Sequence, residues 1–367
     1  MDKNLVGKWY KEDMGETINI FNEEPLRMKM SFTSSGYYNF SPNCVYEKDG
    51  LFCYEINDEH YRMVYRVKFE DGKIVGSYTQ FGNETPVEYV RVSVEPEDGE
   101  FRYESPFSTL PETGEKRIDI LRRFAEYDYG RKEDPYSTEY VLGGEKPSIL
   151  DKYDYDSYVA GKSGDELVFA LLNFVCDHFK HNGGGGTGGA GITEIIRFCE
   201  RNNMSTNCRG LAILLSSLLR LNGIRARHIT CMPYEQPFND CHVVVDCELP
   251  SGARVMIDPT YRLYLKDAKG EYVSLTRLRE MLISGEEYFP NVDAGYNGGG
   301  FDLSGHREYM TKNTLRFSRG TLAADGHDDD DRRCVRLVPN GYPPEDGGFS
   351  DAEKASFVFD DRKFWEM

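Results

Sequence analysis

The sequence predicts two units of different class, an N-terminal all-β antiparallel barrel over residues 1–95 and an α+β domain over residues 151–367. Polar and apolar positions alternate in short runs through the first 95 residues, which is typical of strands. Helical spacing of apolar positions at residues 164–180, followed by a leucine-rich helix and apolar strand runs at 206–264, indicates the α+β domain. A length of 367 residues also fits two domains of ordinary size.

The N-terminal strands are predicted to close into a barrel. Alternating runs separated by turn residues occur at residues 26–32, 61–69, 74–81 and 87–92. Runs at this spacing indicate antiparallel strands. Closure removes the exposed strand edges that would otherwise pair with other chains, so we expect a barrel rather than an open sheet.

Gly7 and Trp9 in the first run resemble the glycine-x-tryptophan signature of the first strand of lipocalin-like barrels. In that family the tryptophan closes one end of the barrel. The resemblance implies that a small apolar ligand can lie inside. The alternative is that side chains fill the interior, as they often do in a small barrel.

Residues 96–150 are expected to form a linker and the entry to the second domain, because Pro, Glu, Tyr and Gly are frequent there. A long helix is expected at residues 164–180. The glycine-rich residues 183–191 then indicate a loop. We do not expect a phosphate-binding loop, because no Gly-Lys-Ser/Thr closes it and no clear strand leads into it.

The chain is acidic, with 44 Lys and Arg against 62 Asp and Glu and a formal net charge of −18. Such a chain repels phosphate backbones and anionic bilayers, so nucleic acids and membranes are not expected partners. The aspartate run at residues 328–331 is expected to be a solvated loop, since its surroundings lack the ligand spacing of a calcium site. No stretch resembles a signal peptide or a membrane span. The nine cysteines, an odd number without paired spacing, indicate reduced thiols and a cytoplasmic location.

Cys208 is expected to lie in the first turn of a leucine-rich helix, with Asn207 as its N-cap and Gly223 near its end. A thiol at that position feels the positive end of the helix dipole and nearby free N–H groups, and both lower its pKa. Its own backbone N–H also lies where an oxyanion forms during acyl transfer. Cys208 is therefore a candidate nucleophile.

His242 and Asp258 are expected to face each other across a hairpin with its turn at residues 249–252. Positions 242 and 258 average to 250, within that turn, so antiparallel register would set their Cβ atoms about 4.5–5.5 Å apart. The carboxylate would hold one imidazole nitrogen and leave the other to a thiol. A shift of one residue would set Pro259 opposite His242 instead.

The order of these features resembles that of the transglutaminase-like branch of the papain-like thiol enzymes. The matching residues are Cys208 before its helix, Gly-Ile-x-Ala-Arg at 223–227, His242 opening a strand and Asp258 closing the next before a proline. The resemblance covers residues 166–264 and implies a papain-like α+β fold. It also implies that Cys208 is the nucleophile, His242 the general base and acid, and Asp258 the residue that orients His242, without a metal or other cofactor.

Three further residues are candidates for contact with the substrate or the oxyanion. His181 and Asn182 lie in a segment that resembles the His-Asn-Gly segment of some bacterial relatives, and Tyr261 follows Asp258 closely. The alternative for His181 and Asn182 is a helix end followed by a turn. The alternative for Tyr261 is packing beneath the site.

Two functions remain open. The first is a cysteine-dependent acyl-transfer enzyme that forms a thioester between Cys208 and an amide or peptide carbonyl, and acts as a peptidase, deamidase or transglutaminase. The second is a non-catalytic ligand-binding or scaffold protein with a lipocalin-like barrel and a degenerate papain-like domain. Zinc is not expected, because His178 and His181 form one close pair but no Cys-x-x-Cys accompanies it.

Overall fold

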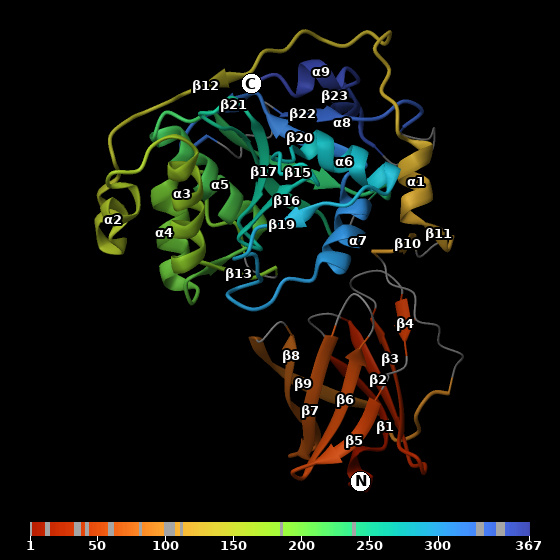
Figure 1. The fold of residues 1–367 in the computed structure, drawn as a ribbon. Coiled ribbons are helices and arrows are strands. Elements are labelled where there is room, and N and C mark those ends of the chain that lie inside the picture. Colours follow the sequence, from red (N-terminus) through yellow and green to blue (C-terminus); the bar gives the residue numbers. More distant parts are fainter. Residues whose placement is uncertain are drawn as a thin grey trace. The chain divides into compact units, whose positions relative to one another are not determined.

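The computed structural model divides the chain into two compact units (Figure 1). The first contains Met1–Asp119 and Gly299–Tyr309, and the second contains Ile120–Gly298 and Met310–Met367. The structure describes residues 2–11, 15–32, 38–40, 44–57, 62–80, 83–98, 107–110, 113–183, 186–236, 240–327, 334–342 and 349–367.

A nine-stranded antiparallel sheet forms most of the first unit, in the order β4-β3-β2-β1-β9-β8-β7-β6-β5. The strands are β1 (Gly7–Lys11), β2 (Glu16–Phe21), β3 (Arg27–Phe32), β4 (Tyr38–Phe40), β5 (Cys44–Lys48), β6 (Leu51–Asn57), β7 (Arg62–Glu70), β8 (Lys73–Gln80) and β9 (Asn83–Ser93). Two hairpin turns consist of Asp49-Gly50 and Asp71-Gly72, in which all four residues have positive φ. Asp-Gly is favoured there because type I′ turns need positive φ at both positions.

The sheet is barrel-like because its two edge strands are consecutive in sequence. β4 and β5 lie at opposite ends of the strand order, yet only residues 41–43 separate them. Four residue steps span at most about 14 Å, whereas the edges of nine flat strands would lie about 38 Å apart. The sheet must therefore curl until its edges approach, which confirms the predicted antiparallel barrel, while the similarity to lipocalins remains a prediction.

Aromatic side chains fill the core of this sheet. Trp9 is fully buried and its Nε1 donates to the carbonyl oxygen of Leu5 at 2.8 Å. Tyr54 and Tyr65 stack with ring centroids 4.3 Å apart, and the Tyr54 hydroxyl lies 3.0 Å from that of Tyr89. All three tyrosines are fully buried, which favours a filled interior over a ligand cavity.

An eight-stranded sheet lies at the centre of the second unit, in the order β19-β18-β17-β16-β15-β20-β22-β23 (Figure 1). Neighbouring strands are antiparallel, except that β22 and β23 are parallel. The strands are β15 (Ala226–Met232), β16 (His242–Glu248), β17 (Arg254–Asp258), β18 (Leu263–Lys266), β19 (Phe289–Pro290), β20 (Arg316–Gly320), β22 (Cys334–Leu337) and β23 (Phe357–Val358).

Helix α5 (Cys208–Leu221) packs against β15 and β16 of this sheet, and α3 (Gly164–His178) and α4 (Ile192–Arg201) pack against α5. Leu214 and Leu218 of α5 are completely buried in one core with Val245 and Ile257 of the sheet. The observed α3 and α5 correspond to the two helices predicted from apolar spacing. Together with the mixed sheet they confirm the α+β class of the second unit.

The remaining elements are further helices and pairs of short strands. The helices are α1 (Arg117–Arg123), α2 (Tyr155–Val159), α6 (Leu275–Ser284), α7 (Leu303–Asn313), α8 (Asp351–Ala355) and α9 (Asp361–Phe364), with 3-10 turns η1 (Lys3–Leu5) and η2 (Ser148–Tyr153). The paired short strands are β10 (Thr109–Leu110) with β11 (Glu115–Lys116), β12 (Glu139–Tyr140) with β21 (Leu322–Ala323), and β13 (Lys180–His181) with β14 (Ser205–Thr206).

The register of the β16–β17 hairpin differs from the predicted one. Val245 pairs with Ile257 and Glu248 pairs with Arg254, so the residue numbers of each pair add up to 502. The numbers of His242 and Asp258 add up to 500, so these two residues are not a directly opposed pair. The turn is centred one residue later than expected, because the N–H of Leu249 donates to the carbonyl oxygen of Ala253 at 2.8 Å. The prediction that His242 lies directly opposite Asp258 is therefore wrong by two residues.

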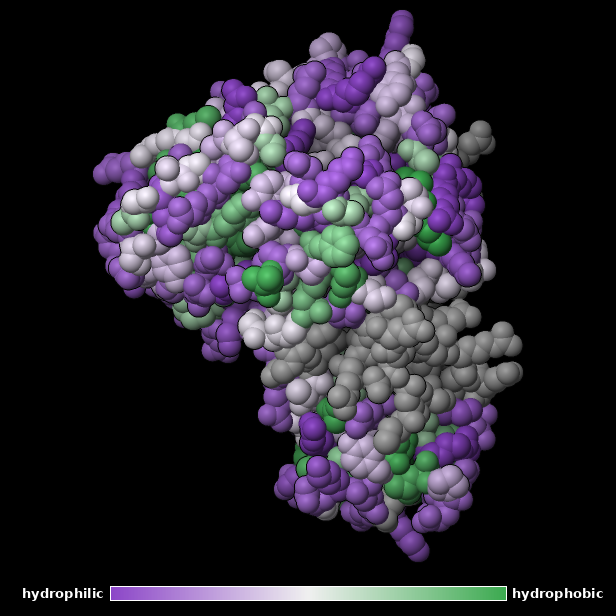
Figure 2. Space-filling model, in the orientation of Figure 1, coloured by the Kyte–Doolittle hydropathy of each residue, from purple (hydrophilic) through white to green (hydrophobic). Residues whose placement is uncertain are grey.

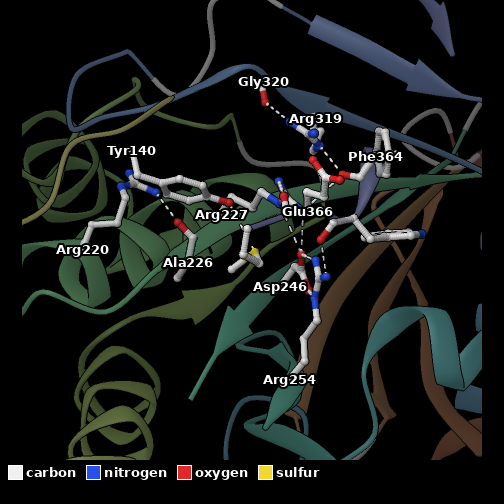
Figure 3. A network of polar contacts seen from close by, with 12 residues as sticks. Tyr140, Arg220, Ala226, Arg227, Asp246, Arg254, Arg319, Gly320, Phe364 and Glu366 are labelled. Atoms are coloured by element: carbon white, nitrogen blue, oxygen red, sulfur yellow. Dashed lines mark hydrogen bonds and ion pairs between the residues drawn. The ribbon is translucent and has the colours of Figure 1, made fainter. Parts of the chain in front are cut away.

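A buried network joins the sheet to the C-terminal residues (Figure 3). Asp246 of β16 is fully buried and accepts from Nε of Arg227 at 3.2 Å and from Nε of Arg254 at 2.7 Å. Arg227 and Arg319 also donate to the carbonyl oxygen of Phe364, at 3.3 and 2.9 Å. These contacts attach the end of α9 to the strands that carry the arginines.

Hydrophilic residues predominate on the face of the protein drawn in Figure 2, with smaller apolar groups between them. Among the described residues no helix combines the length and apolar character needed to cross a bilayer. The aspartate run at residues 328–331, predicted to be a solvated loop, lies outside the described residues.

Candidate active site

Cys208 is the first residue of α5, where the side chain of Asn207 caps the helix. Oδ1 of Asn207 accepts from the backbone N–H of Gly210 at 2.9 Å, as predicted for an N-cap. A Cβ atom on Gly210 would lie 2.1 Å from Oγ1 of Thr206 and 2.7 Å from the carbonyl oxygen of Thr187. Glycine is therefore required here because the chain before Cys208 packs directly on the first turn of α5.

Part of the glycine-rich loop also lies at this turn. The hydroxyl of Thr206 donates to the carbonyl oxygens of Gly186 and Thr187, at 2.9 and 3.0 Å. Nδ2 of Asn207 lies 3.2 Å from Oγ1 of Thr187. These bonds hold the residues before Cys208 in an extended conformation and support the N-cap.

His242 and Asp258 form a buried hydrogen-bonded pair. Nε2 of His242 lies 2.6 Å from Oδ2 of Asp258, and the two side chains are only 2% and 0% exposed. The other carboxylate oxygen, Oδ1, accepts from the backbone N–H of Thr260 at 2.9 Å. Because Asp258 occupies Nε2, the nitrogen left for other partners is Nδ1.

The thiol of Cys208 lies between two histidines and hydrogen-bonds to both His181 and His242. Burial disfavours the thiolate, but the hydrogen bonds from His181 and His242 and their charges outweigh it and lower the pKa of Cys208 to about 6. Burial likewise disfavours the imidazolium of His242, but the Asp258 carboxylate outweighs it and raises the pKa of His242 to about 10. Both shifts favour a thiolate–imidazolium pair at neutral pH.

His181 reaches the thiol from β13, a two-residue strand directly after α3. β13 runs parallel to β14, with His181 paired to Thr206, two residues before Cys208. Nδ1 of His181 lies 3.1 Å from the hydroxyl of Tyr296. The adjacent Asn182 is exposed, and its backbone N–H donates to the carbonyl oxygen of Thr206 at 2.8 Å.

Tyr261 lies beside the histidine pair. Its ring centroid is 6.1 Å from that of His242 and 5.8 Å from that of Tyr296. Burial, then the negative charge of Asp258, raises the pKa of Tyr261 well above its ordinary value, so the phenol stays neutral. The structure thus brings together all the sequence-predicted residues except Asn182, whose side chain points to solvent.

Two residues of the site were missed in the sequence, Tyr296 and Asn297. They lie in the glycine-rich residues 295–300, where no periodic pattern predicts an element. The one signal that could have identified them in the sequence is a tyrosine and an asparagine among turn-forming glycines. Their contact with His181 spans more than 110 residues of sequence, so no local argument could assign it.

Six other cysteines differ electrostatically from Cys208. Burial raises the pKa of Cys53, Cys176, Cys199, Cys231, Cys241 and Cys247. Eight cysteines, Cys208 among them, are free thiols. In that same part no group of three or more His, Cys, Asp or Glu side chains is arranged to hold a metal ion.

One region of the chain matches a known protein family. Residues 155–259, which include Cys208, His242 and Asp258, match the model of the transglutaminase-like superfamily. No match to this chain was found among curated proteins.

Two solved structures are similar to parts of the chain. A candidate protease from Parabacteroides distasonis ATCC 8503 has 11% identity and a TM-score of 0.24, and the similarity covers 57% of this chain and 39% of that one. A candidate cysteine protease from Cytophaga hutchinsonii has 14% identity and a TM-score of 0.24, over 77% of this chain and 83% of that one. The chain thus spans about two fifths of the length of the first of these proteins. Because residues 155–259 match this family model, the chain carries a domain of the transglutaminase-like superfamily.

Proposed function

We propose that this protein is a cysteine-dependent acyl-transfer enzyme that acts on the amide or peptide carbonyl of a peptide or protein. The observation that carries the proposal is the thiol of Cys208 hydrogen-bonded to His242, which is in turn bonded to a buried Asp258. A nucleophile, a base and a residue that orients the base are the groups that thiol-dependent acyl transfer needs. The transglutaminase-like domain that contains all three supports the same chemistry.

Acylation begins from the thiolate–imidazolium pair. The sulfur of Cys208 bonds to the carbonyl carbon, and the carbonyl π electrons move onto the oxygen. The backbone N–H of Cys208, at the start of α5, is placed to stabilise that oxyanion, and we assign His181 and Tyr261 to contacts with the oxyanion or the substrate. Asn182, which is exposed, is left with a contact to the substrate outside this group. Collapse then breaks the carbon–nitrogen bond, and the leaving amine takes the proton of His242.

Deacylation uses the same groups in reverse. His242, now neutral, takes a proton from water or from an amine as that nucleophile attacks the thioester carbon. The carbon–sulfur bond breaks, the thiolate leaves, and the imidazolium pair is restored. Water gives peptidase or deamidase activity, and an amine gives transglutaminase activity. None of these steps draws on a cofactor.

The free state of the described cysteines suits a reducing compartment, so we place the enzyme in the cytoplasm. The alternative function, a ligand-binding or scaffold protein with a degenerate domain, would not require an activated thiol. The pKa of Cys208, lowered by two histidines, therefore favours the enzyme.

The experiment that tests the proposal is the pH dependence of iodoacetamide labelling, read by peptide mass spectrometry in the parent and in His242→Ala. We expect Cys208 in the parent to label down to about pH 6 and to react roughly tenfold or more faster there than Cys334, an internal control that is partly exposed. His242→Ala should move its labelling to higher pH. If Cys208 labels no faster than Cys334 in either protein, the enzyme assignment fails and the binding function becomes the better account.

A further inference from the structure

The glycine-rich turn at residues 295–300 takes no part in the mechanism above, yet it directs two side chains toward the site. Asn297 and Gly298 have φ values of 50° and 83°, so the chain reverses direction there. The N–H of Gly295 donates to the carbonyl oxygen of Tyr261 at 2.7 Å, which ties the turn to a residue beside His242. The turn is therefore fixed to the same group of residues that contains Cys208.

Asn297 binds the backbone of His181 as a neighbouring strand would. Its Oδ1 accepts from the N–H of His181 at 2.8 Å, and its Nδ2 donates to the carbonyl oxygen of His181 at 2.9 Å. On the other side of this short strand, the N–H of Lys180 donates to the carbonyl oxygen of Met204, just before β14, and the N–H of Asn182 donates to that of Thr206 in β14, each at 2.8 Å. A strand of two residues is thus held from both sides, which fixes the position from which the His181 side chain extends.

Tyr296 binds the side chain of the same histidine. Its hydroxyl lies 3.1 Å from Nδ1 of His181, and the two rings meet at 71° with centroids 5.6 Å apart. With Nδ1 occupied, Nε2 is the nitrogen available to the sulfur of Cys208. The hydrogen bond on one ring nitrogen decides which nitrogen carries the proton, so a hydroxyl that donates to Nδ1 places the proton on Nε2.

The two histidines beside Cys208 therefore have different partners. His242 is bonded to a buried carboxylate, which holds it as a cation. His181 is bonded to the hydroxyl of Tyr296, which orients the ring. The first histidine can exchange a proton with substrate, whereas the second can donate a hydrogen bond to the sulfur or to an oxyanion.

We propose that Tyr296 and Asn297 are positioning residues that act through His181, with Asn297 fixing its backbone and Tyr296 its tautomer, so that Nε2–H points at the Cys208 sulfur. This rests on the proposed function, since it assigns His181 a role beside the reactive thiol. It goes further by giving the glycine-rich turn a part in the reaction. It also gives the two histidines different roles, with His242 transferring protons and His181 donating a hydrogen bond.

The direct test is ¹⁵N NMR of the full chain labelled at histidine, with the His181 signals assigned through His181→Gln. We expect His181 of the parent to be the Nε2–H tautomer, Tyr296→Phe to remove that preference, and Tyr264→Phe to leave it unchanged. Tyr264 is a matched control, because its ring packs on Phe169 and Tyr272. An Nδ1–H tautomer in the parent overturns the proposal, and so does a Tyr296→Phe spectrum identical to that of the parent.

A double-mutant cycle on Cys208 labelling supplies the second readout. At about pH 6, Tyr296→Phe should slow labelling severalfold and at most about tenfold, the effect of one pKa unit on the thiolate fraction. In a His181→Ala background the same change should have no further effect, because Tyr296 acts through His181. Equal and additive losses in both backgrounds would show a merely structural role and overturn the assignment.

The two proposals fail in different ways. If Cys208 of the parent shows no activated labelling, the proposed function is wrong, while the tautomer of His181 is still read directly by NMR. If Cys208 is activated but His181 has the wrong tautomer, only the role of Tyr296 is wrong. If circular dichroism shows that Tyr296→Phe is unfolded, the tautomer of His181 in the parent chain alone tests the role of Tyr296.

Discussion

His242 and Asp258 are bonded at 2.6 Å although the strand register offsets them by two residues. Continuing the register of β16 and β17 sets Asp258 opposite Val244, so the hydrogen-bonded pair is diagonal. Diagonal neighbours on one face of a sheet have Cα atoms about 7–8 Å apart, which an imidazole and a carboxylate can span together. The diagonal arrangement leaves Nδ1 of His242 free of Asp258, and that is the nitrogen available to Cys208.

Replacing Asp258 by Asn is expected to reduce the reactivity of Cys208. The carboxylate raises the pKa of His242, so its loss lowers that pKa and leaves less imidazolium to stabilise the thiolate near neutral pH. We expect the labelling curve of Cys208 to move to higher pH by about one unit or more, about tenfold in thiolate at pH 7. Iodoacetamide labelling across a pH series measures the shift.

Asp293→Asn is the matched control for this change, because Asp293 is exposed in a loop of the same unit and makes no hydrogen bond to either histidine. Its labelling curve should coincide with that of the parent. Circular dichroism establishes that both variants are folded. An Asp258→Asn protein that is folded and labels like the parent would remove Asp258 from the reactive group.

The sequence predicted that these side chains lie near one another because two of its features are periodic. The N-cap and helical spacing located Cys208 at the start of α5. Side chains alternate faces along a strand with a period of two, so an error of two residues in the hairpin register still left His242 and Asp258 on the same face. A one-residue error would have separated them.

The contacts of His181 could not be predicted in the same way. They depend on a two-residue parallel pairing and on a turn more than 110 residues further along the chain, and neither has a periodic signature. The network around Asp246 was missed for a related reason. Its acceptors beyond the sheet are backbone carbonyls such as that of Phe364, and backbone groups carry no sequence signal.

Asn207→Asp should separate the stability of α5 from the reactivity of its first residue. Aspartate accepts from the N–H of Gly210 as well as asparagine does, so the midpoint of thermal unfolding should stay near that of the parent. The added negative charge opposes the neighbouring thiolate, so the labelling curve of Cys208 should move to higher pH. Differential scanning calorimetry and iodoacetamide labelling measure the two effects.

Asn207→Ala supplies the complementary case. It removes the cap and should cost about 1 kcal/mol of stability, but it adds no charge, so the labelling curve should move less than in Asn207→Asp. If both variants shift the curve equally, the charge at position 207 does not act on Cys208. In that case the effect comes from the geometry of the first turn.

Gly210→Ala should destabilise the start of α5. The new methyl group would overlap Oγ1 of Thr206 and the carbonyl oxygen of Thr187, and relieving the overlap should cost about 1–3 kcal/mol. Urea unfolding measures this cost. Gly130→Ala is the control, because there the added atom meets only Oδ1 of Asp128 at an ordinary 3.5 Å. Equal midpoints for the two variants would mean that the residues before Cys208 can move aside without cost.

Asp246→Asn should lower stability and change its dependence on pH. Asp246 is fully buried between Arg227 and Arg254, so removing its charge leaves two arginines without their anion and should cost about 3–5 kcal/mol (Figure 3). The arginines outweigh the effect of burial and hold the pKa of Asp246 below its ordinary value. A carboxyl whose pKa is lower in the folded state stabilises the protein above its unfolded pKa of about 3.9, and this contribution is lost as the pH falls through the folded value.

Urea unfolding of the parent and of Asp246→Asn over a pH series checks both parts. The difference in unfolding free energy should be largest near neutral pH and should shrink as the solution is acidified below about pH 4. Asp151→Asn, which removes an exposed partner of Lys146, should leave the midpoint almost unchanged, since surface ion pairs contribute little. A constant difference at every pH would mean that Asp246 contributes through its shape and hydrogen bonds and that its charge is not what stabilises the network.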